Sequence, residues 1–214
     1  MFLYKYDRLF QWAFPRYHWK IPTQEKVIYL TFDDGPIPDV TEWVLEQLAV
    51  YQAKATFFCI GDNIRKHLEV FQQVQLQGHA IGNHTYNHLN GWKTDTETYL
   101  RNVDQCAAIM AEHADDLSNP LFRPPYGRFT KDQASHILKT HRAIMWNVLT
   151  GDFSKELSPE TILQKSIQYS EAGSIVVFHD SLKAQSNLTY VLPRYLAHFA
   201  EQGYRFEHLA SVFK

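Results

Sequence analysis

The chain has 214 residues, of which 45% are hydrophobic, and this is enough for one domain with a well-buried core. Its 21 basic and 23 acidic residues leave a formal net charge of −2, so no overall field would gather nucleic acid or an anionic membrane. The composition therefore argues against a nucleic-acid-binding protein and favours neutral partners.

Cysteine usage and the N-terminal residues bear on the compartment. Cys59 lies in an apolar run and Cys106 in a helical segment, so we expect two buried free thiols rather than a disulfide framework. Charged residues interrupt the first 22 residues, which therefore lack the apolar core of a secretory signal: Lys5, Asp7, Arg8, Arg16 and Lys20. No stretch is long enough to cross a bilayer. By default we expect a cytoplasmic protein without a transmembrane segment.

The N-terminal residues predict a helix outside the main body of the protein. Apolar residues recur at helical spacing between residues 2 and 13, so we expect an amphipathic helix that ends near Pro15. We divide the chain into a helical extension (1–22) and one domain (23–214). Two interpretations stay open: the extension packs on the domain, or residues 1–14 contact a membrane surface.

The first half of the domain alternates strands with helices. β-branched and aromatic residues from Val27 to Leu30 predict a buried strand, which continues to Asp33-Asp34 and ends at the turn residues Gly35-Pro36. The next apolar patterns predict a helix over 39–51, a strand over 55–60, a helix over 63–77 and a short run over 79–83.

The second half of the domain continues this alternation. A Ser158-Pro159 pair marks the start of one helix, because serine caps a helix and proline suits its first position. The predicted elements are helices over 95–113, 131–141, 158–170 and 187–201, and strands near 121–122 and over 143–148, 174–178 and 204–206. About seven strands in alternation with helices indicate an α/β fold with a parallel sheet, either an irregular barrel or a doubly wound sheet.

Polar residues that can perform chemistry follow the predicted strands. In both candidate folds the active site lies at the C-terminal ends of the strands. Residues of this kind stand at or just beyond those ends: Asp33, Asp34, His84, His88, Arg123, Asp152 and His179. Solvated surface residues would scatter over both ends, so the arrangement indicates one site. Two adjacent carboxylates can divide the work, one binding a metal and the other handling protons.

The segment from His84 to His88 is a candidate metal-binding motif. On a helical turn, two residues four apart have Cβ atoms about 5 to 6 Å apart, so both imidazoles can reach one ion. Two histidines and one carboxylate leave open positions for water and substrate. The same ligand set suits a non-haem iron oxygenase, although that class has no use for Asp33 or His179.

Four motifs, in this order, resemble the polysaccharide deacetylase family, also called the NodB-homology domain. They are Thr-Phe-Asp-Asp-Gly-Pro at 31–36, His-Thr-x-x-His at 84–88, Arg-Pro-Pro-Tyr-Gly at 123–127 and an apolar strand ending in His-Asp at 179–180. The resemblance covers about residues 26–207. It implies a distorted barrel of the (β/α)7 type, with fewer units than the common eight-stranded barrel.

The resemblance also implies a metal and a reaction. Asp34, His84 and His88 would bind a divalent metal, usually zinc and sometimes cobalt or another transition ion. The substrate would be an acetylated glycan, and the reaction would be hydrolysis of N-acetyl groups from an N-acetylglucosamine-containing oligo- or polysaccharide. Two alternatives remain: an O-acetyl esterase acting on xylan, and a carbohydrate-binding relative whose catalytic activity has lapsed.

Residue roles follow from the same resemblance. Asp33 would be the general base and His179 the general acid. Arg123 would hold Asp33 in place, and Asp152 would tune His179. The backbone N–H of Tyr126 would help to stabilise the oxyanion.

The substrate pocket is where the chain departs from the family. Phe153 and Val177 would form the walls of the acetyl-methyl pocket, and Trp92 is a candidate for stacking on a sugar. The family often has an acid at the position of Leu149, a tryptophan at the position of Phe153 and a leucine at the position of Val177. These changes predict a substrate pocket that differs in this loop from the one usual in the family.

Overall fold

The computed structural model describes residues 12–114 and 116–213, which form an α/β fold around a parallel sheet. The strands follow one path in the order β5-β4-β3-β2-β1-β7-β6, and β8 pairs with β1 outside that path. Their bounds are β1 (Val27–Asp33), β2 (Ala55–Cys59), β3 (Ala80–Asn83), β4 (Leu121–Phe122), β5 (Arg142–Ala143), β6 (Val148–Leu149), β7 (Ile175–His179) and β8 (Arg205–Phe206). Seven strands along one curved path, among the described residues, confirm the distorted barrel.

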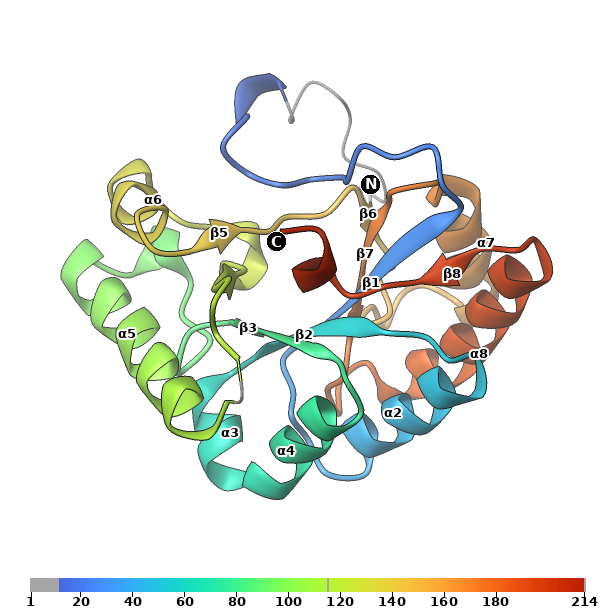
Figure 1. The fold of residues 1–214 in the computed structure, drawn as a ribbon, viewed down its shortest axis with the longest axis horizontal. Coiled ribbons are helices and arrows are strands. Elements are labelled where there is room, and N and C mark those ends of the chain that lie inside the picture. Colours follow the sequence, from blue (N-terminus) through green and yellow to red (C-terminus); the bar gives the residue numbers. More distant parts are fainter. Residues whose placement is uncertain (1–11, 115, 214) are drawn as a thin grey trace.

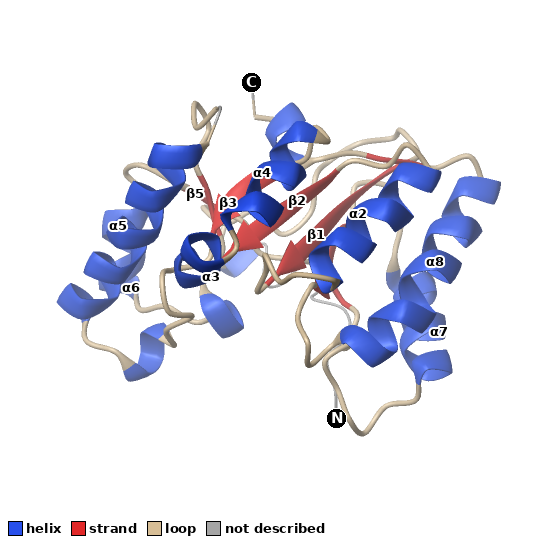
Figure 2. Ribbon diagram, turned by 90° about the horizontal axis from the view of Figure 1, so that it is seen from below, coloured by secondary structure: helices blue, strands red, loops and turns tan. Residues whose placement is uncertain are grey.

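Helices surround this sheet. They are α2 (Val40–Val50), α3 (Gly61–Lys66), α4 (Leu68–Leu76), α5 (Thr96–His113), α6 (Lys131–Ile137), α7 (Pro159–Tyr169) and α8 (Gln185–Glu201). Figure 1 shows α5 and α6 on one side of the strands, α7 and α8 on the other, and α2, α3 and α4 between them. Figure 2, from a perpendicular direction, shows α2, α3 and α4 lying over β1, β2 and β3.

Two predicted elements are wrong in detail. The single helix expected over 63–77 is divided into α3 and α4 at His67, whose φ of −132° and ψ of 49° are not helical. The single strand expected over 143–148 is two short strands, because β5 pairs with β4 and β6 pairs with β7. β5 and β6 are the two ends of the strand order, so residues 144–147 carry the chain from one edge of the sheet to the other.

Alternation along β1 separates two apolar clusters. Ile28, Leu30 and Phe32 belong to the cluster between the sheet and the helices. Val27 and Tyr29 point the other way, into a cluster inside the barrel. Because successive side chains of a strand face opposite sides, Thr31 and Asp33 lie on the same side as Val27 and Tyr29. The polar end of β1 therefore opens onto the interior of the barrel.

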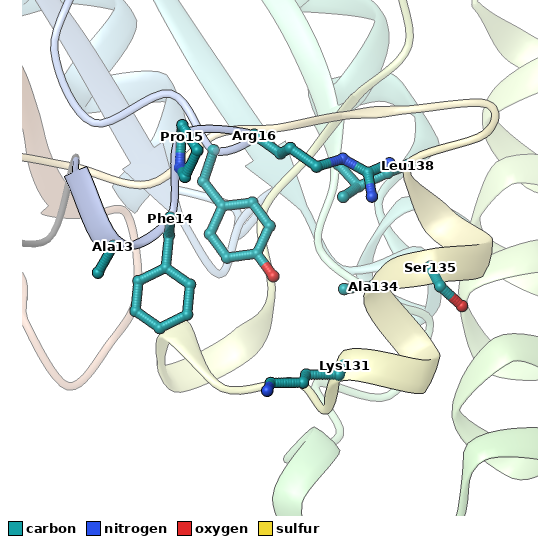
Figure 3. A pocket seen from close by; sticks show the side chains of 9 residues that line it. Ala13, Phe14, Pro15, Arg16, Lys131, Ala134, Ser135 and Leu138 are labelled. Atoms are coloured by element: carbon teal, nitrogen blue, oxygen red, sulfur yellow. The ribbon is translucent and has the colours of Figure 1, made fainter.

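The chain before β1 packs on the barrel. Trp19 and Ile21 are buried in the interior cluster, and His18 and Lys20 form single backbone bridges with Ile144 and Ser174. Just before them, Phe14 lies near α6, where the two segments line a shallow pocket of about 300 Å³ (Figure 3). The division of the chain at residue 22 stays a prediction.

Predictions about the N-terminal segment, membrane spans and cysteines can be compared with the described residues only in part. Most of the amphipathic helix, and most of the segment expected to contact a membrane surface, lies in residues 1–11, outside the described residues. Within the described part of the chain, no helix has the length and apolar character needed to span a bilayer. Cys59 and Cys106 are both free and buried, as predicted.

Candidate active site

Two neighbouring strands bring an acid and a histidine to the same end of the barrel. β1 and β7 are parallel partners, and their register places Asp33 opposite His179. Both residues are the last of their strands, and Asp33 is buried. Residues remote in sequence thus meet at one rim, as the strand-end pattern predicted.

The turn after β1 fixes Asp34. Its φ of 85° is in the left-handed region, so the side chain of Asp34 does not follow the alternation of side chains along β1. Asn63 donates a hydrogen bond to the Asp34 carbonyl at 2.7 Å. Asp180 accepts hydrogen bonds from the Gly35 N–H at 3.0 Å and from the Thr41 hydroxyl at 2.7 Å. A Cβ on Gly35 would lie 1.9 Å from the Asp180 carboxylate, so only glycine fits there.

The segment from His84 to His88 is not a helical turn, and that prediction is wrong. It is irregular, and Thr85 and His88 have φ values of 63° and 55°. The two rings nevertheless lie with their centroids 5.1 Å apart. A loop with two left-handed residues therefore brings the imidazoles together.

Asn102, on α5, holds this loop in shape. Its Oδ1 accepts hydrogen bonds from the backbone N–H groups of Tyr86 and Asn87, each at 2.9 Å. Its Nδ2 donates to the side chain of Asn87 at 2.9 Å. One buried amide thus satisfies two loop donors that have no place in a helix or strand.

Asp34, His84 and His88 form a candidate metal site. Each offers one ligand atom, and the three atoms lie within 4.8 Å of one another. Oδ1 of Asp34 lies 3.7 Å from Nε2 of His84 and 3.2 Å from Nε2 of His88. This Oδ1 is buried and accepts no hydrogen bond from any described residue. Three converging donor atoms, one of them a buried oxygen without a hydrogen-bond donor, fit a divalent cation.

The orientation of His84 also suits a metal ligand. Its Nδ1 lies 2.8 Å from the carbonyl oxygen of Arg123, which holds the proton on Nδ1 and directs the lone pair of Nε2 to the site. Burial lowers the pKa of His84 to about 4, so its ring is neutral at pH 7. Burial would raise the pKa of Asp34, but the imidazoles of His88, His179 and His84 hold it well below its usual range. Both groups therefore take the protonation state that binds a metal.

Arg123 connects the metal site to Asp33. Its side chain is 0% exposed, and it donates hydrogen bonds to Oδ1 of Asp33 and to the Thr31 hydroxyl, both at 2.7 Å. The remaining donors bind the carbonyls of Ile144 at 3.2 Å and Met145 at 2.9 Å. The buried guanidinium thus fixes one oxygen of Asp33. The other oxygen, Oδ2, lies 4.0 Å from Nε2 of His84.

His179 is paired with a second buried carboxylate. Its Nδ1 lies 2.8 Å from Oδ1 of Asp152, and its backbone N–H donates to Oδ2 of the same residue at 2.8 Å. Asn187, on α8, donates to the Asp152 carbonyl at 2.8 Å. Burial would lower the pKa of His179, but the Asp152 charge, followed by those of Asp34 and Asp33, raises it to about 9. His179 is therefore protonated at neutral pH.

These groups line a pocket of about 440 Å³. Its lining residues are Asp33, Asp34, His84, His88, Tyr126, Arg128, Trp146, Leu149, Phe153, Val177, His179 and Lys183. Phe153, Val177 and Leu149 all line this pocket, and their contact with an acetyl methyl group stays a prediction. Trp92 is not in this lining: it is 64% exposed and lies under the guanidinium of Arg128, 4.9 Å from ring centroid to Cζ.

Tyr126 occupies a strained position at the edge of this pocket. Its φ of 60° is in the left-handed region, which a non-glycine residue adopts at a cost. Its ring meets the ring of His88 edge-on, with centroids 4.7 Å apart. Within the described residues its backbone N–H donates to no acceptor.

The sequence alone did not assign a role to several residues that shape the site. Asn102 and Asn187 lie in segments with a helical pattern, and nothing in that pattern indicates which groups their side chains bind. Asp180 stands next to His179 in a recognisable motif, yet only the structure shows that it anchors the turn after β1. Arg128 and Lys183 lie in loops that line the pocket, and neither belongs to a sequence motif that indicates this position.

Comparison with known proteins agrees with this geometry. The family model described as polysaccharide deacetylase matches residues 20–142. A peptidoglycan-N-acetylglucosamine deacetylase of Bacillus cereus is 32% identical over 201 residues, covering 92% of this chain and 92% of the relative. A chitooligosaccharide deacetylase of Azorhizobium caulinodans is 32% identical and covers 75% of this chain and 77% of the relative.

A solved structure is similar over almost the whole fold. It is the crystal structure of a peptidoglycan N-acetylglucosamine deacetylase in complex with 4-naphthalen-1-yl-N-oxidanyl-benzamide. The TM-score is 0.87 at 29% identity, with 94% of this chain and 95% of the other covered. Sequence, fold and the arrangement of the site therefore agree that this chain belongs to the polysaccharide deacetylase family, whose members use a divalent metal.

Proposed function

We propose that this protein hydrolyses the N-acetyl group of N-acetylglucosamine residues in an oligo- or polysaccharide. One observation carries the proposal. One pocket contains a three-ligand metal site together with a proton acceptor and a proton donor. The acceptor is Asp33, held by Arg123, and the donor is His179, held by Asp152. Amide hydrolysis needs this combination, because water must lose a proton and the departing amine must gain one.

The metal would be zinc, bound by Asp34, His84 and His88. Two imidazoles and one carboxylate with an open position are typical of catalytic zinc, and cobalt or another transition ion suits the same set. When bound, it would supply polarisation of the amide carbonyl and acidify the attacking water. Everything else in the reaction falls to side chains and backbone groups of this chain.

Asp33 acts as the base in this proposal. Arg123 holds its Oδ1, which leaves Oδ2 to take the proton of the attacking water. Tyr126 offers its backbone N–H to the oxygen on which negative charge develops, and its fixed position avoids a reorganisation cost during the reaction.

His179 acts as the acid. Its Nδ1 is engaged by Asp152, so Nε2 is the atom that gives a proton to the departing amine. The raised pKa of His179, about 9, keeps this proton in place at neutral pH. Phe153, Leu149 and Val177 offer an apolar wall for the acetyl methyl group, with the Phe153 ring 5.0 Å from the His179 ring.

Acetate release tests the proposal. Purified protein loaded with zinc is incubated with chitooligosaccharides, peptidoglycan fragments and acetylated xylan, and free acetate is measured. We expect release from the N-acetylated glycans, loss of release with a chelator and recovery with zinc or cobalt. Release from xylan alone would favour the esterase, and glycan binding without any release would favour the lapsed relative.

A further inference from the structure

Two aromatic side chains in the segment before β1 are exposed. Trp12 is 80% exposed and Phe14 is 43% exposed, and they stand two residues apart. Figure 1 shows this segment, in blue, projecting beyond the strands and helices of the barrel. Aromatic side chains gain much from burial, so two of them on a projecting segment indicate a surface that contacts a partner.

The segment that carries these side chains is held on the barrel. The Phe14 ring stacks on the Tyr17 ring with centroids 5.6 Å apart, and the Tyr17 ring lies 5.2 Å from that of Phe129. Nε1 of the buried Trp19 donates a hydrogen bond to the Phe14 carbonyl at 3.4 Å. Because the segment is already ordered, a partner that binds it pays little of the entropy cost of fixing a loop.

Two cations lie beside the exposed aromatic residues. Arg16 and Lys131, the first residue of α6, line the same shallow pocket as Phe14 (Figure 3). No acidic residue lines this pocket. No carboxylate of residues 12–114 or 116–213 forms an ion pair with either cation, whereas Arg65, on α3, pairs with an acid.

The segments around this pocket are locally basic. Residues 12–22 and 131–142 together contain five basic residues and one acid, Asp132. Among the described residues only Lys20 of these five forms an ion pair, with Glu171. This face is therefore positive, although the whole chain has a formal charge of −2. A negatively charged partner is attracted to this face and not to the molecule as a whole.

We propose that Trp12, Phe14, Arg16 and Lys131 form a docking surface for an anionic phospholipid bilayer. Exposed aromatic residues beside cations suit the membrane interface, where rings enter the headgroup region and cations bind lipid phosphates. The sequence of residues 2–10 extends the combination, because it holds apolar residues at helical spacing together with basic ones. The inference does not depend on the reaction proposed above.

Two other occupants fit the docking surface less well. A two-fold dimer would bring the same positive face of two copies together, and the like charges would repel. A neutral glycan can stack on exposed rings, but it gains little from the two cations. An anionic bilayer uses both the rings and the charges.

Vesicle flotation tests this inference. The full chain is mixed with vesicles of phosphatidylcholine, alone or with about 30% phosphatidylglycerol, and the fraction that floats is measured. We expect about tenfold stronger partitioning to the anionic vesicles, falling as salt rises from roughly 0.1 to 0.5 M because screening weakens exposed charges. No flotation with anionic vesicles, or equal flotation with both kinds, would overturn the inference.

The double variant Trp12→Ser/Phe14→Ser assigns the flotation to the aromatic residues. Its partition coefficient should fall by about tenfold or more, because two apolar side chains no longer enter the interface. The matched control is Val50→Ser/Leu76→Ser, which removes exposed apolar side chains from the last positions of α2 and α4 and should float as the wild type does. Equal flotation of the two double variants would contradict the assignment.

The charges have a matched pair of variants as well. Arg16→Gln/Lys131→Gln should lose most of the preference for anionic vesicles and most of the salt dependence. Lys155→Gln/Arg194→Gln removes two exposed cations, one before α7 and one on α8, and should keep both. The same loss in both pairs would mean that net charge, and not this surface, drives the binding.

Fluorescence locates the contact directly. Lipids with brominated acyl chains quench a tryptophan that enters the bilayer, so Trp12→Phe should remove most of the quenching while it keeps flotation. Trp92→Phe, at an exposed tryptophan on another segment, should leave the quenching in place. Quenching that persists in Trp12→Phe would mean that another face meets the bilayer, and the inference would fail.

Other measurements separate this inference from its competitors and from the proposed function. A wild type that does not float, and whose dimers in light scattering become monomers in Trp12→Ser/Phe14→Ser, would replace the bilayer with a second copy. Retention on insoluble chitin, lost in the same variant and again without flotation, would replace it with a glycan. Acetate release from soluble chitooligosaccharides should be unchanged in this variant. If no glycan releases acetate from the wild type, flotation still decides whether the docking surface exists.

Discussion

The two halves of the site are built differently. The strand half consists of Asp33 and His179, the last residues of two hydrogen-bonded strands in register. The loop half consists of His84 and His88, in the irregular segment after β3, and Tyr126, in the 3-10 turn Pro125–Gly127 after β4. His88 and Tyr126 have positive φ values, whereas Asp33 and His179 keep extended backbone.

The difference shows how each half is held. Sheet pairing fixes the strand half, so its geometry comes from the same hydrogen bonds that form the barrel. The loop half depends on groups from elsewhere in the chain, above all the side chain of Asn102 and the backbone carbonyl of Arg123. Arg123 joins the halves, because its carbonyl orients His84 while its guanidinium holds Asp33. Variants of each half should therefore fail in different ways.

The largest effect is expected in the loop half, for His84→Ala. Loss of one of three ligands should remove the metal, and with it several kcal/mol of transition-state stabilisation. Activity should fall by about 10⁴-fold or more. Metal content by mass spectrometry should fall in parallel. His136→Ala, which removes an exposed histidine on α6, is the matched control and should keep both metal and activity.

The next effect is expected in the strand half, for Asp33→Asn. The amide cannot accept the proton of water, so kcat should fall by about 10²- to 10⁴-fold. Metal content should stay near that of the wild type, because Asp33 is not among the three converging ligands. Loss of metal in His84→Ala and retention of metal in Asp33→Asn would show that the loop half binds the metal independently of the strand half. Equal loss of metal in Asp33→Asn would show that the halves are not independent.

The same division explains what the sequence could predict. Asp33 and His179 were placed correctly because an apolar strand that ends in a polar residue is a local pattern, and parallel strands end at one rim. The helical turn expected at His84 was wrong, because spacing does not reveal the left-handed residues Thr85 and His88. The two residues between them, Tyr86 and Asn87, are held by Asn102 of α5, a helix that begins eight residues after His88.

The predicted strand over 143–148 is divided in two for a similar reason, namely that local sequence does not reveal the tertiary contacts of the segment. All of its residues except Asn147 are apolar, and Ile144, Met145 and Trp146 are buried inside the barrel. Burial alone does not tell which neighbour a segment pairs with. The chain leaves β4 and joins β7 within six residues, because this segment connects the two edges of the curved sheet, and local propensity does not encode that.

A third prediction concerns pH and the strand half. His179 must carry a proton to assist the departing amine, and its pKa is raised to about 9, so the rate should fall as pH rises through about 9. In Asp152→Asn the raising charge is lost while burial remains, so this alkaline limb should move to lower pH. At pH 8 the rate should fall by about 10- to 100-fold.

Full pH profiles of kcat/KM check this. Asp104→Asn, which removes an exposed acid on α5, should leave the alkaline limb in place. An alkaline limb that does not move in Asp152→Asn would mean that a group other than His179 supplies the proton.

The smallest effect is expected for Asn102→Ala, which touches neither metal nor substrate. It removes the side-chain acceptor shared by the Tyr86 and Asn87 N–H groups and should loosen the loop that carries both imidazoles, although the Tyr86 N–H keeps the backbone carbonyl of residue 102 at 3.1 Å. Metal affinity should weaken by about tenfold, the size usual for a residue that orients a ligand, while kcat at saturating zinc stays close to that of the wild type. Gln105→Ala removes an exposed amide from the same helix and should change neither quantity. Because the strand half does not depend on Asn102, a large fall in kcat at saturating zinc would mean that the loop also positions Asp33 or His179, and the distinction between the halves would fail.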